Sequence, residues 1–397
     1  MSRKRGNGEG SISRRKTGGW RAEYVVHTAE GRKRKTVYGK TRAEVARKLN
    51  RALADAEDGL FFDDEGLKVG EYLERWLESS VRGNVSPRTY TNYRLQVRRH
   101  LVPALGGIKL RELTPFKVQG LYRSKLDAGL SNASVRYTHA VLHRALKQAV
   151  KWSLVPRNVA EAVDPPQVRR EEITPLSPAQ SRAFLAAARG DRFEALYVVA
   201  LTCGLRQGEV LGLKWSDVDL GAKTLRVNRQ VQRLRRDGSA GKLAFSEPKN
   251  ASRRTVPLTG TAVEALRRHG KRQAEEKIRV GSLYGDEGLL FASEAGTPLD
   301  AQNVVNRSFK PLLRRAGLPS IRFHDLRHTC ATLLLAKGVH PKFVQVLLGH
   351  ASIGITLDLY SHWAPVMGDQ AAAAMEDVLR EDYAEAEDTG NAENDVA

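Results

Sequence analysis

Residues 321–362 read IRFHDLRHTCATLLLAKGVHPKFVQVLLGHASIGITLDLYSH, and this stretch decides how the rest of the chain is interpreted. Apolar residues recur at helical spacing over residues 325–337, which predicts a helix. His324 and Arg327 lie three positions apart at the start of that segment, so we expect both side chains on one helix face.

Two further helices follow in the same stretch. Gly338 ends the first helix, Pro341 begins the second, and Gly349 ends it immediately before His350. A short turn then leads into a third segment that carries Tyr360. The stretch therefore predicts that successive helix ends bring a guanidinium, two imidazoles and a phenol together.

Such a group of side chains is suited to attack on a phosphodiester. Phosphoryl transfer builds negative charge on the non-bridging oxygens, and fixed Arg and His donors stabilise that charge. Positive charge nearby also favours the phenolate of a tyrosine, whose ordinary pKa is about 10.

At these residues the chain resembles the tyrosine recombinase (phage integrase) family. The sequences His324-Asp-Leu-Arg327-His, Leu348-Gly349-His350 and TLDLYSH around Tyr360 match its second and third active-site boxes. The resemblance also requires an upstream arginine and a lysine on a β-hairpin. TCGLRQGEVLGLKW and SEPKNASRRTVPL supply them in the expected order. It implies a catalytic set with Tyr360 as nucleophile and Glu209 in support: Arg206, Lys249, His324, Arg327, His350 and Tyr360.

What the resemblance implies is a site-specific recombinase that cuts DNA through a 3′-phosphotyrosyl bond and integrates or excises a mobile element. The ester keeps the bond energy, so we expect neither a metal nor a cofactor. Alternatives are a dimer resolvase of the Xer kind, a type IB topoisomerase and a non-enzymatic regulator. A zinc site at His324 and His328 is disfavoured, because no HExxH or paired CxxC pattern accompanies them.

Composition is compatible with this interpretation. The chain has 397 residues, a formal charge of +20 and 41% hydrophobic residues, so it can fill real cores and favours a polyanionic partner. Two cysteines give no disulfide framework and favour a reducing compartment. Apolar runs are too short to span a bilayer. We expect a cytoplasmic, nucleoid-associated protein with no membrane contact.

The N-terminal segment is predicted to form three short strands and a helix. The strands are expected at residues 11–15, 20–28 and 32–38, and the helix is expected to begin near Thr41. The segment resembles the arm-binding domain of lambda-type integrases. Its basic residues are candidate DNA contacts: Arg14, Arg15, Lys16, Arg21, Arg32 and Arg34.

Four amphipathic helices are predicted between residues 68 and 156, with starts at Gly70, Ser86, Thr114 and Ser131. They resemble the family's core-binding bundle and leave basic residues outside, of which four are candidate DNA contacts: Arg94, Arg98, Arg144 and Lys147.

The fold class predicted for the whole chain is multidomain and mainly α with small β elements (α+β). Its parts are an arm-type domain (1–59), a linker (60–67), a helical SAM-like domain (68–156), a second linker (157–175), a catalytic domain (176–380) with a β-hairpin, and an acidic disordered tail (381–397). By resemblance the partners are double-stranded DNA with core-type and arm-type sites, three further protomers in a homotetramer, an excision factor and a host DNA-bending protein.

Overall fold

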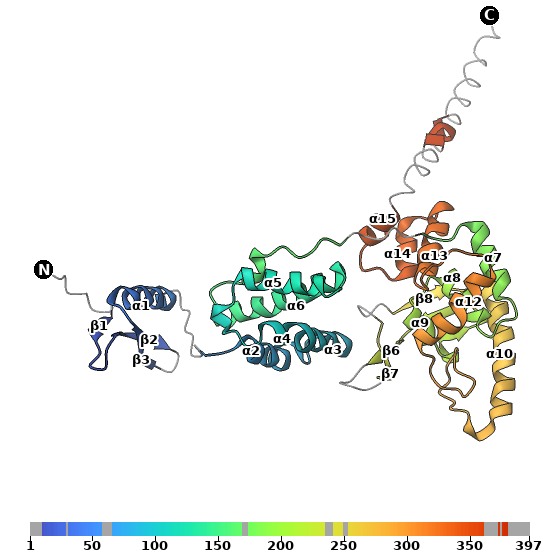
Figure 1. Ribbon diagram of the computed structural model, residues 1–397. Coiled ribbons are helices and arrows are strands. Elements are labelled where there is room, and N and C mark those ends of the chain that lie inside the picture. The colour runs from blue at the N-terminus through green and yellow to red at the C-terminus, as the bar shows by residue number, and fades with distance from the viewer. Residues whose placement is uncertain are drawn as a thin grey trace, which may run out of the picture. The chain divides into compact units, whose positions relative to one another are not determined.

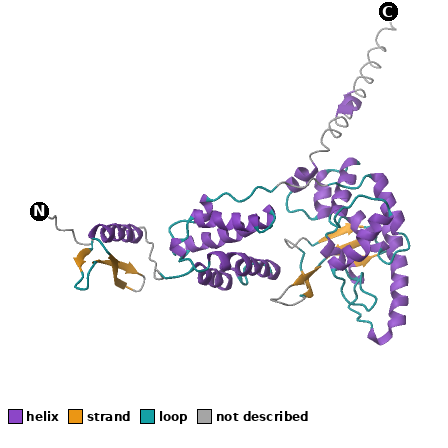
Figure 2. Cartoon of the chain, viewed as in Figure 1, coloured by secondary structure: helices purple, strands orange, loops and turns teal. Residues whose placement is uncertain are grey.

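The computed structural model describes residues 10–28, 31–57, 66–168, 174–234, 241–248, 253–360, 372–373 and 375–379. Lys249 and the tail from residue 381 onward lie outside these residues, as do the side chains of Arg32 and Tyr360. The chain is mainly helical with small antiparallel sheets, which confirms the predicted fold class (Figure 2). It forms two compact units, residues 1–170 and 171–397.

A three-stranded antiparallel sheet and one helix form the N-terminal module (Figure 1). The strands β1 (Ser11–Arg14), β2 (Trp20–Thr28) and β3 (Gly31–Gly39) follow each other in the sheet, and α1 (Arg42–Glu57) covers one face. Ala22 and Tyr24 of β2 pack against Val45 and Leu49 of α1, because alternate strand residues share a face.

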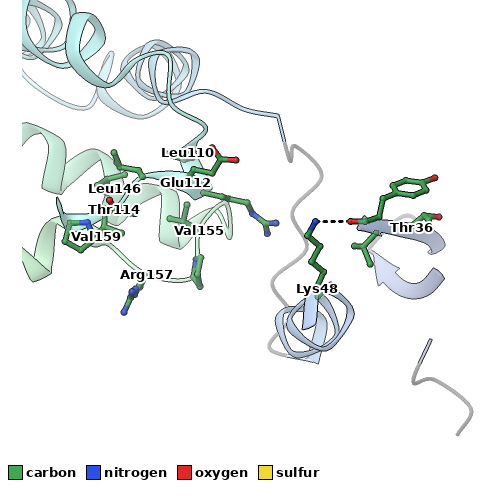
Figure 3. A pocket seen from close by; sticks show the side chains of 16 residues that line it. Thr36, Lys48, Leu110, Glu112, Thr114, Leu146, Val155, Arg157 and Val159 are labelled. Atoms are coloured by element: carbon green, nitrogen blue, oxygen red, sulfur yellow. Dashed lines mark hydrogen bonds between the residues drawn. The ribbon is translucent and has the colours of Figure 1, made fainter. Parts of the chain in front are cut away.

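The start of α1 is similar to a capping box but differs from it in one hydrogen bond. The Glu44 amide donates to Thr41 Oγ1 at 3.2 Å, but the Glu44 carboxylate accepts from the backbone amide of Lys40 at 2.8 Å. Lys48 Nζ donates to the Tyr38 carbonyl at 2.9 Å and so ties α1 to β3 (Figure 3).

The helical segment, as described, has the four helices that the sequence predicts, because α3 and α4 are joined by a π-helical turn into one continuous helix, and α2 also continues into such a turn. Its helices are α2 (Val69–Trp76), α3 (Pro87–Gln96), α4 (Val102–Leu105), α5 (Pro115–Asp127) and α6 (Asn132–Lys151). Backbone amides in the first turns of α3, α5 and α6 donate hydrogen bonds to the side chains of Ser86, Thr114 and Ser131, respectively. Aromatic residues such as Tyr72 and Trp76 fill a closed core between the helices.

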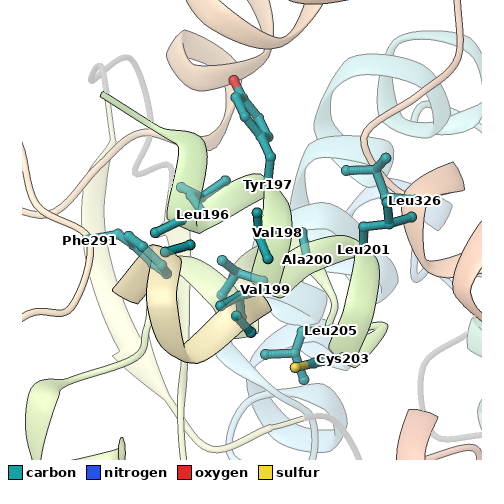
Figure 4. Packing of buried hydrophobic residues seen from close by; sticks show 14 of the residues in the cluster. Leu196, Tyr197, Val198, Val199, Ala200, Leu201, Cys203, Leu205, Phe291 and Leu326 are labelled. Atoms are coloured by element: carbon teal, nitrogen blue, oxygen red, sulfur yellow. The ribbon is translucent and has the colours of Figure 1, made fainter. Parts of the chain in front are cut away.

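In the second unit, small antiparallel sheets are surrounded by helices. They are α7 (Pro178–Ala188), α8 (Glu194–Cys203), α9 (Gln207–Leu211), α10 (Gly260–Val280), α11 (Ala301–Val304), α12 (Lys310–Arg315), α13 (Asp325–Ala336), α14 (Pro341–Leu348) and α15 (Ile353–Tyr360). The most buried of them is α8, where side chains such as Leu196, Val199 and Leu201 pack on Phe291 and Leu326 (Figure 4).

Among the residues of this unit that the structure describes, five strands make two separate antiparallel sheets, β4-β5-β8 and β6-β7. They are β4 (Val218–Asp219), β5 (Thr224–Val227), β6 (Gln230–Leu234), β7 (Lys242–Ser246) and β8 (Arg254–Pro257). The structure contains a hairpin, β6 and β7, but it is not the predicted one, because the strands on either side of Lys249 (β7 and β8) do not pair with each other. Strand β8 pairs with β5. In the sequence, β6 and β7 lie between these two strands and pair with each other as a separate ribbon. Turn residues alone could not reveal that exchange of partners.

Within the described residues, no helix is both long and apolar enough to cross a membrane.

Candidate active site

The turn between α8 and α9 places Arg206. Helix α8 ends at Gly204, whose φ of +59° lies in the left-handed region that favours glycine. A Cβ at Gly204 would lie 2.4 Å from Leu348 Cδ2 and 3.2 Å from Cys330 Sγ, so only glycine fits this close approach. The chain therefore turns sharply, and Arg206 stands at the N-terminus of α9.

Arg206 is held by two groups. Its Nη1 donates to Glu209 Oε1 at 2.7 Å, and its Nη2 donates to the Gly349 carbonyl at 3.0 Å. These contacts use two of the five N–H donors of the guanidinium. The Arg206 side chain retains 25% of its exposure, so the remaining donors can face an incoming phosphate.

Glu209 lies beneath Arg206 and is fully buried. Burial disfavours its charge, but bonds and charges from Arg254 and then Arg206 outweigh burial and lower the pKa of its carboxyl below the ordinary value. The Arg206 backbone amide also donates to Glu209 Oε2 at 3.0 Å. Glu209 therefore stays ionised and fixes both the backbone and the side chain of Arg206.

Arg327 enters the same place from the first turn of α13. Its side chain is almost fully buried, and Nη1 donates to the Gly204 carbonyl at 2.8 Å. Arg206 and Arg327 are thus anchored at the two ends of one three-residue turn, residues 204–206. The structure brings together two guanidinium groups that are 121 positions apart in the sequence.

His350 follows the left-handed residue Gly349, whose φ is +67° and which caps α14. Its Nδ1 is 2.8 Å from Oγ1 of Thr356, a fully buried residue of α15. The bond therefore connects His350 with α15, the helix that ends at Tyr360.

His324 stands at the start of α13, with its ring centroid 4.9 Å from that of His328. Desolvation, followed by the charges of His328 and Arg327, lowers the pKa of His324 to about 4. Desolvation, followed by the charges of Arg327 and Arg206, lowers the pKa of His350 to about 4. Both imidazoles are therefore neutral at pH 7.

This electrostatic situation predicts the pH dependence of cleavage. Since the folded imidazoles take up protons below the ordinary pKa of about 6.5, kcat/KM for cleavage should show no histidine inflection between about pH 6 and 8. Rates measured under single-turnover conditions, with His350→Gln as the comparison, test this. An inflection near pH 6.5 that disappears in His350→Gln would contradict neutral imidazoles.

Both cysteines lie behind the arginines and are buried. Burial raises the pKa of Cys203 to about 11 and that of Cys330 to about 12, so almost no thiolate forms at neutral pH. N-ethylmaleimide should therefore leave the native protein unmodified and active, while both thiols should react after unfolding. Mass spectrometry of the two samples measures this, and rapid native labelling would show that the core opens.

Four of the six predicted catalytic residues, Arg206, His324, Arg327 and His350, therefore converge. Lys249 and the side chain of Tyr360 lie outside the described residues, although the backbone of α15 extends to Tyr360. Sequence reasoning missed Arg254 and Thr356 as site residues. A signal for Arg254 existed, because it alternates in phase with the buried Val256.

The predicted DNA contacts lie mostly on the surface. Exposed side chains include five residues of the N-terminal module: Arg14, Arg15, Lys16, Arg21 and Arg34. In the helical segment, Arg98 pairs with Glu74 at 3.0 Å, and Arg144 donates to Tyr93 Oη at 3.0 Å. Lys147 is exposed and Arg94 is partly exposed.

Comparison with known proteins identifies the chain. Residues 176–366 match the phage integrase family, and residues 68–126 match the phage integrase N-terminal SAM-like domain. A tyrosine recombinase XerC-like protein of Caldanaerobacter subterraneus subsp. tengcongensis is 32% identical over 361 residues, which cover 87% of this chain and 92% of that protein. The chain belongs to the phage integrase family.

Two further similarities agree with this tyrosine recombinase identity. An integrase of Streptomyces ambofaciens is 32% identical over 351 residues, 86% of this chain and 88% of that protein. The Tn1549 transposon integrase, solved with a circular intermediate DNA, shares the fold with a TM-score of 0.63 at 24% identity, and the match covers 79% of this chain and 100% of that one. The predicted enzyme class, a recombinase that cleaves and rejoins DNA strands, is confirmed, and integrase is favoured over the alternatives.

Proposed function

We propose that this integrase cuts one DNA strand by attack of Tyr360 on a backbone phosphate, which gives a 3′-phosphotyrosyl bond and a free 5′-hydroxyl. The hydroxyl of a partner strand then reverses the step and joins the exchanged strands. The ester conserves the bond energy, so the cycle requires no nucleotide. The observation that carries the proposal is that Arg206, Arg327 and His350 are held close together, with His350 bonded to Thr356 of α15, the helix that ends at Tyr360.

The roles follow from the positions of the groups. Arg206 and Arg327 clamp the non-bridging oxygens of the phosphate, and the neutral imidazoles of His324 and His350 donate hydrogen bonds to it. Lys249 protonates the leaving 5′-oxygen, as the family resemblance implies. Glu209 supports Arg206 without touching the substrate.

We further propose that the N-terminal module, residues 1–59, binds arm-type DNA sites with its open sheet face. Pairing of β2 with β3 places Arg21 beside Tyr38 and Val25 beside Arg34, on the face opposite the buried Ala22. This face combines cations with an exposed aromatic ring, and both favour contact with a DNA backbone.

The helical domain, residues 68–156, is proposed to bind the core-type site. Its cations are braced by aromatic rings: Arg144 lies 5.5 Å from the Tyr93 ring centroid, and Arg94 lies 5.6 Å from that of Tyr90. Bracing reduces the side-chain entropy lost when a guanidinium meets a phosphate.

Assembly as a homotetramer on two DNA sites is also a proposal. Helical residues of the C-terminal segment expose Met375, Val378 and Leu379, a spacing that gives one apolar face suited to a neighbouring protomer. An excision factor and a host DNA-bending protein would set the direction of recombination within the bacterial nucleoid.

The experiment that tests strand cleavage uses the DNA that flanks the gene, tiled as nicked duplexes that trap the covalent intermediate. We expect a protein–DNA adduct on denaturing gels with one tile, without added metal or nucleotide. Tight binding to a tile without any adduct would contradict the proposal and favour a regulator. Relaxation of a supercoiled plasmid that lacks the site would instead favour a topoisomerase.

A further inference from the structure

Arg254 is the first residue of β8, and its side chain is buried, with only 6% of its exposure retained. It connects β8 with Glu209 of α9 and with the end of α14. Its Nη2 donates to Glu209 Oε2 at 2.8 Å, its Nη1 to Oε1 at 3.3 Å, and its Nε to the Leu347 carbonyl at 2.8 Å. The fork therefore holds the carboxylate beneath Arg206 and the last turn of α14 at the same time.

The backbone that leads to His350 rests on this guanidinium. A Cβ placed at Gly349 would lie 2.9 Å from Arg254 Nη1, so the strap of residues 347–349 packs directly on Arg254. Arg206 donates to the Gly349 carbonyl from the same strap. Both arginines thus fix the segment whose next residue is His350.

Glu209 is consequently shared by two cations. Two guanidiniums and one carboxylate leave a net charge of +1 in this cluster, and Arg206 is the more exposed of the two cations. If Arg254 were absent, Glu209 would pair with Arg206 alone and the net charge would be zero. A buried carboxylate with a single partner would also hold that partner more tightly.

We propose that Arg254 is a positioning residue for strand cleavage: it takes up part of the Glu209 charge so that Arg206 stays available to the phosphate, and it sets the strap that carries His350. The proposal rests on the function proposed above for Arg206. Arg254 itself does not touch DNA.

The test compares Arg254→Met, Arg254→Lys and the double variant Arg254→Met/Glu209→Gln, measured as full chains on the nicked duplex under single-turnover conditions. Methionine fills the space without charge, lysine keeps the charge without the fork, and glutamine removes the carboxylate charge at nearly constant shape. The double variant restores the net charge of +1.

We expect Arg254→Met to cleave roughly tenfold to a hundredfold more slowly at saturating enzyme, with the DNA dissociation constant changed by less than about threefold. Arg254→Lys should fall between it and the wild type. Adding Glu209→Gln should speed Arg254→Met at least about fivefold, because the carboxylate that competes with the phosphate for Arg206 is then removed. A merely structural role predicts the opposite, since the second change removes more bonds from the core.

A matched control is Arg192→Met, which breaks a similar buried fork between Arg192 and Glu276, with both bonds at 2.8 Å, away from the site. It should lower the melting temperature but not the cleavage rate of the folded fraction. The proposal is overturned if Arg254→Met cleaves at the wild-type rate, or if adding Glu209→Gln does not raise the cleavage rate of Arg254→Met. Should Arg254→Met fail to fold, wild-type cleavage by Arg254→Lys overturns it equally. Absence of an adduct with the wild type would instead count against the proposed function.

Discussion

Replacement of Tyr360 by phenylalanine is expected to abolish covalent adduct formation and leave DNA affinity unchanged. The substitution removes only the hydroxyl oxygen, and no other group of the site can form the phosphotyrosyl ester. Cleavage should fall below detection, while the phosphate clamp at Arg206 and Arg327 remains complete. Adduct yield on the nicked duplex and binding by electrophoretic mobility shift measure the two quantities.

Tyr284→Phe is the control for this variant. Tyr284 follows the end of α10, with Lys277 Nζ 5.6 Å from its ring centroid, and takes no part in the site. It should cleave like the wild type. Residual adduct in Tyr360→Phe, mapped by mass spectrometry to another tyrosine, would show that the nucleophile is misassigned.

Removal of the clamp should have the second-largest effect. Arg206→Ala or Arg327→Ala is expected to cost about 3 kcal/mol or more of transition-state stabilisation, roughly a hundredfold or more in rate, by analogy with loss of a single oxyanion donor. Single-turnover cleavage rates at saturating enzyme measure this loss.

The two arginines should differ in how the variant protein behaves. Arg327 is almost fully buried, so its loss should also lower the melting temperature, whereas Arg206 is partly exposed and should affect mainly the rate. Arg267→Ala is a suitable control, because Arg267 is exposed on α10. Cleavage at the wild-type rate by either site variant would contradict the proposed role of that residue in binding the phosphate.

Local sequence signals gave the secondary structure near the site with good accuracy. Pro341 begins α14 and Gly349 ends it in the left-handed conformation, as the sequence predicts. These features depend on residues within one turn of each other, so a pattern in the sequence is sufficient to predict them.

The partner of a strand could not be predicted in the same way. The turn signals around Pro248 indicated a strand that returns along its predecessor, but β8 pairs with β5 instead of β7. Period-two alternation tells which strand residues face inward and says nothing about which strand lies alongside. The inward direction of Arg254 was therefore accessible from the sequence, and its contacts with Glu209 and Leu347 were not.

The sequence by itself determined the family and the enzyme class, because the boxes around Arg206, His324 and Tyr360 are short local patterns that occur together in one order. Only the tertiary structure decided how these boxes are supported. Glu209, Arg254 and Gly349 are far apart in the chain, yet they belong to one hydrogen-bonded cluster. Arg254 bonds Glu209 and packs on Gly349, and Arg206 bonds the Gly349 carbonyl. Such a cluster forms when packing excludes water from all its members together, and that depends on the whole fold.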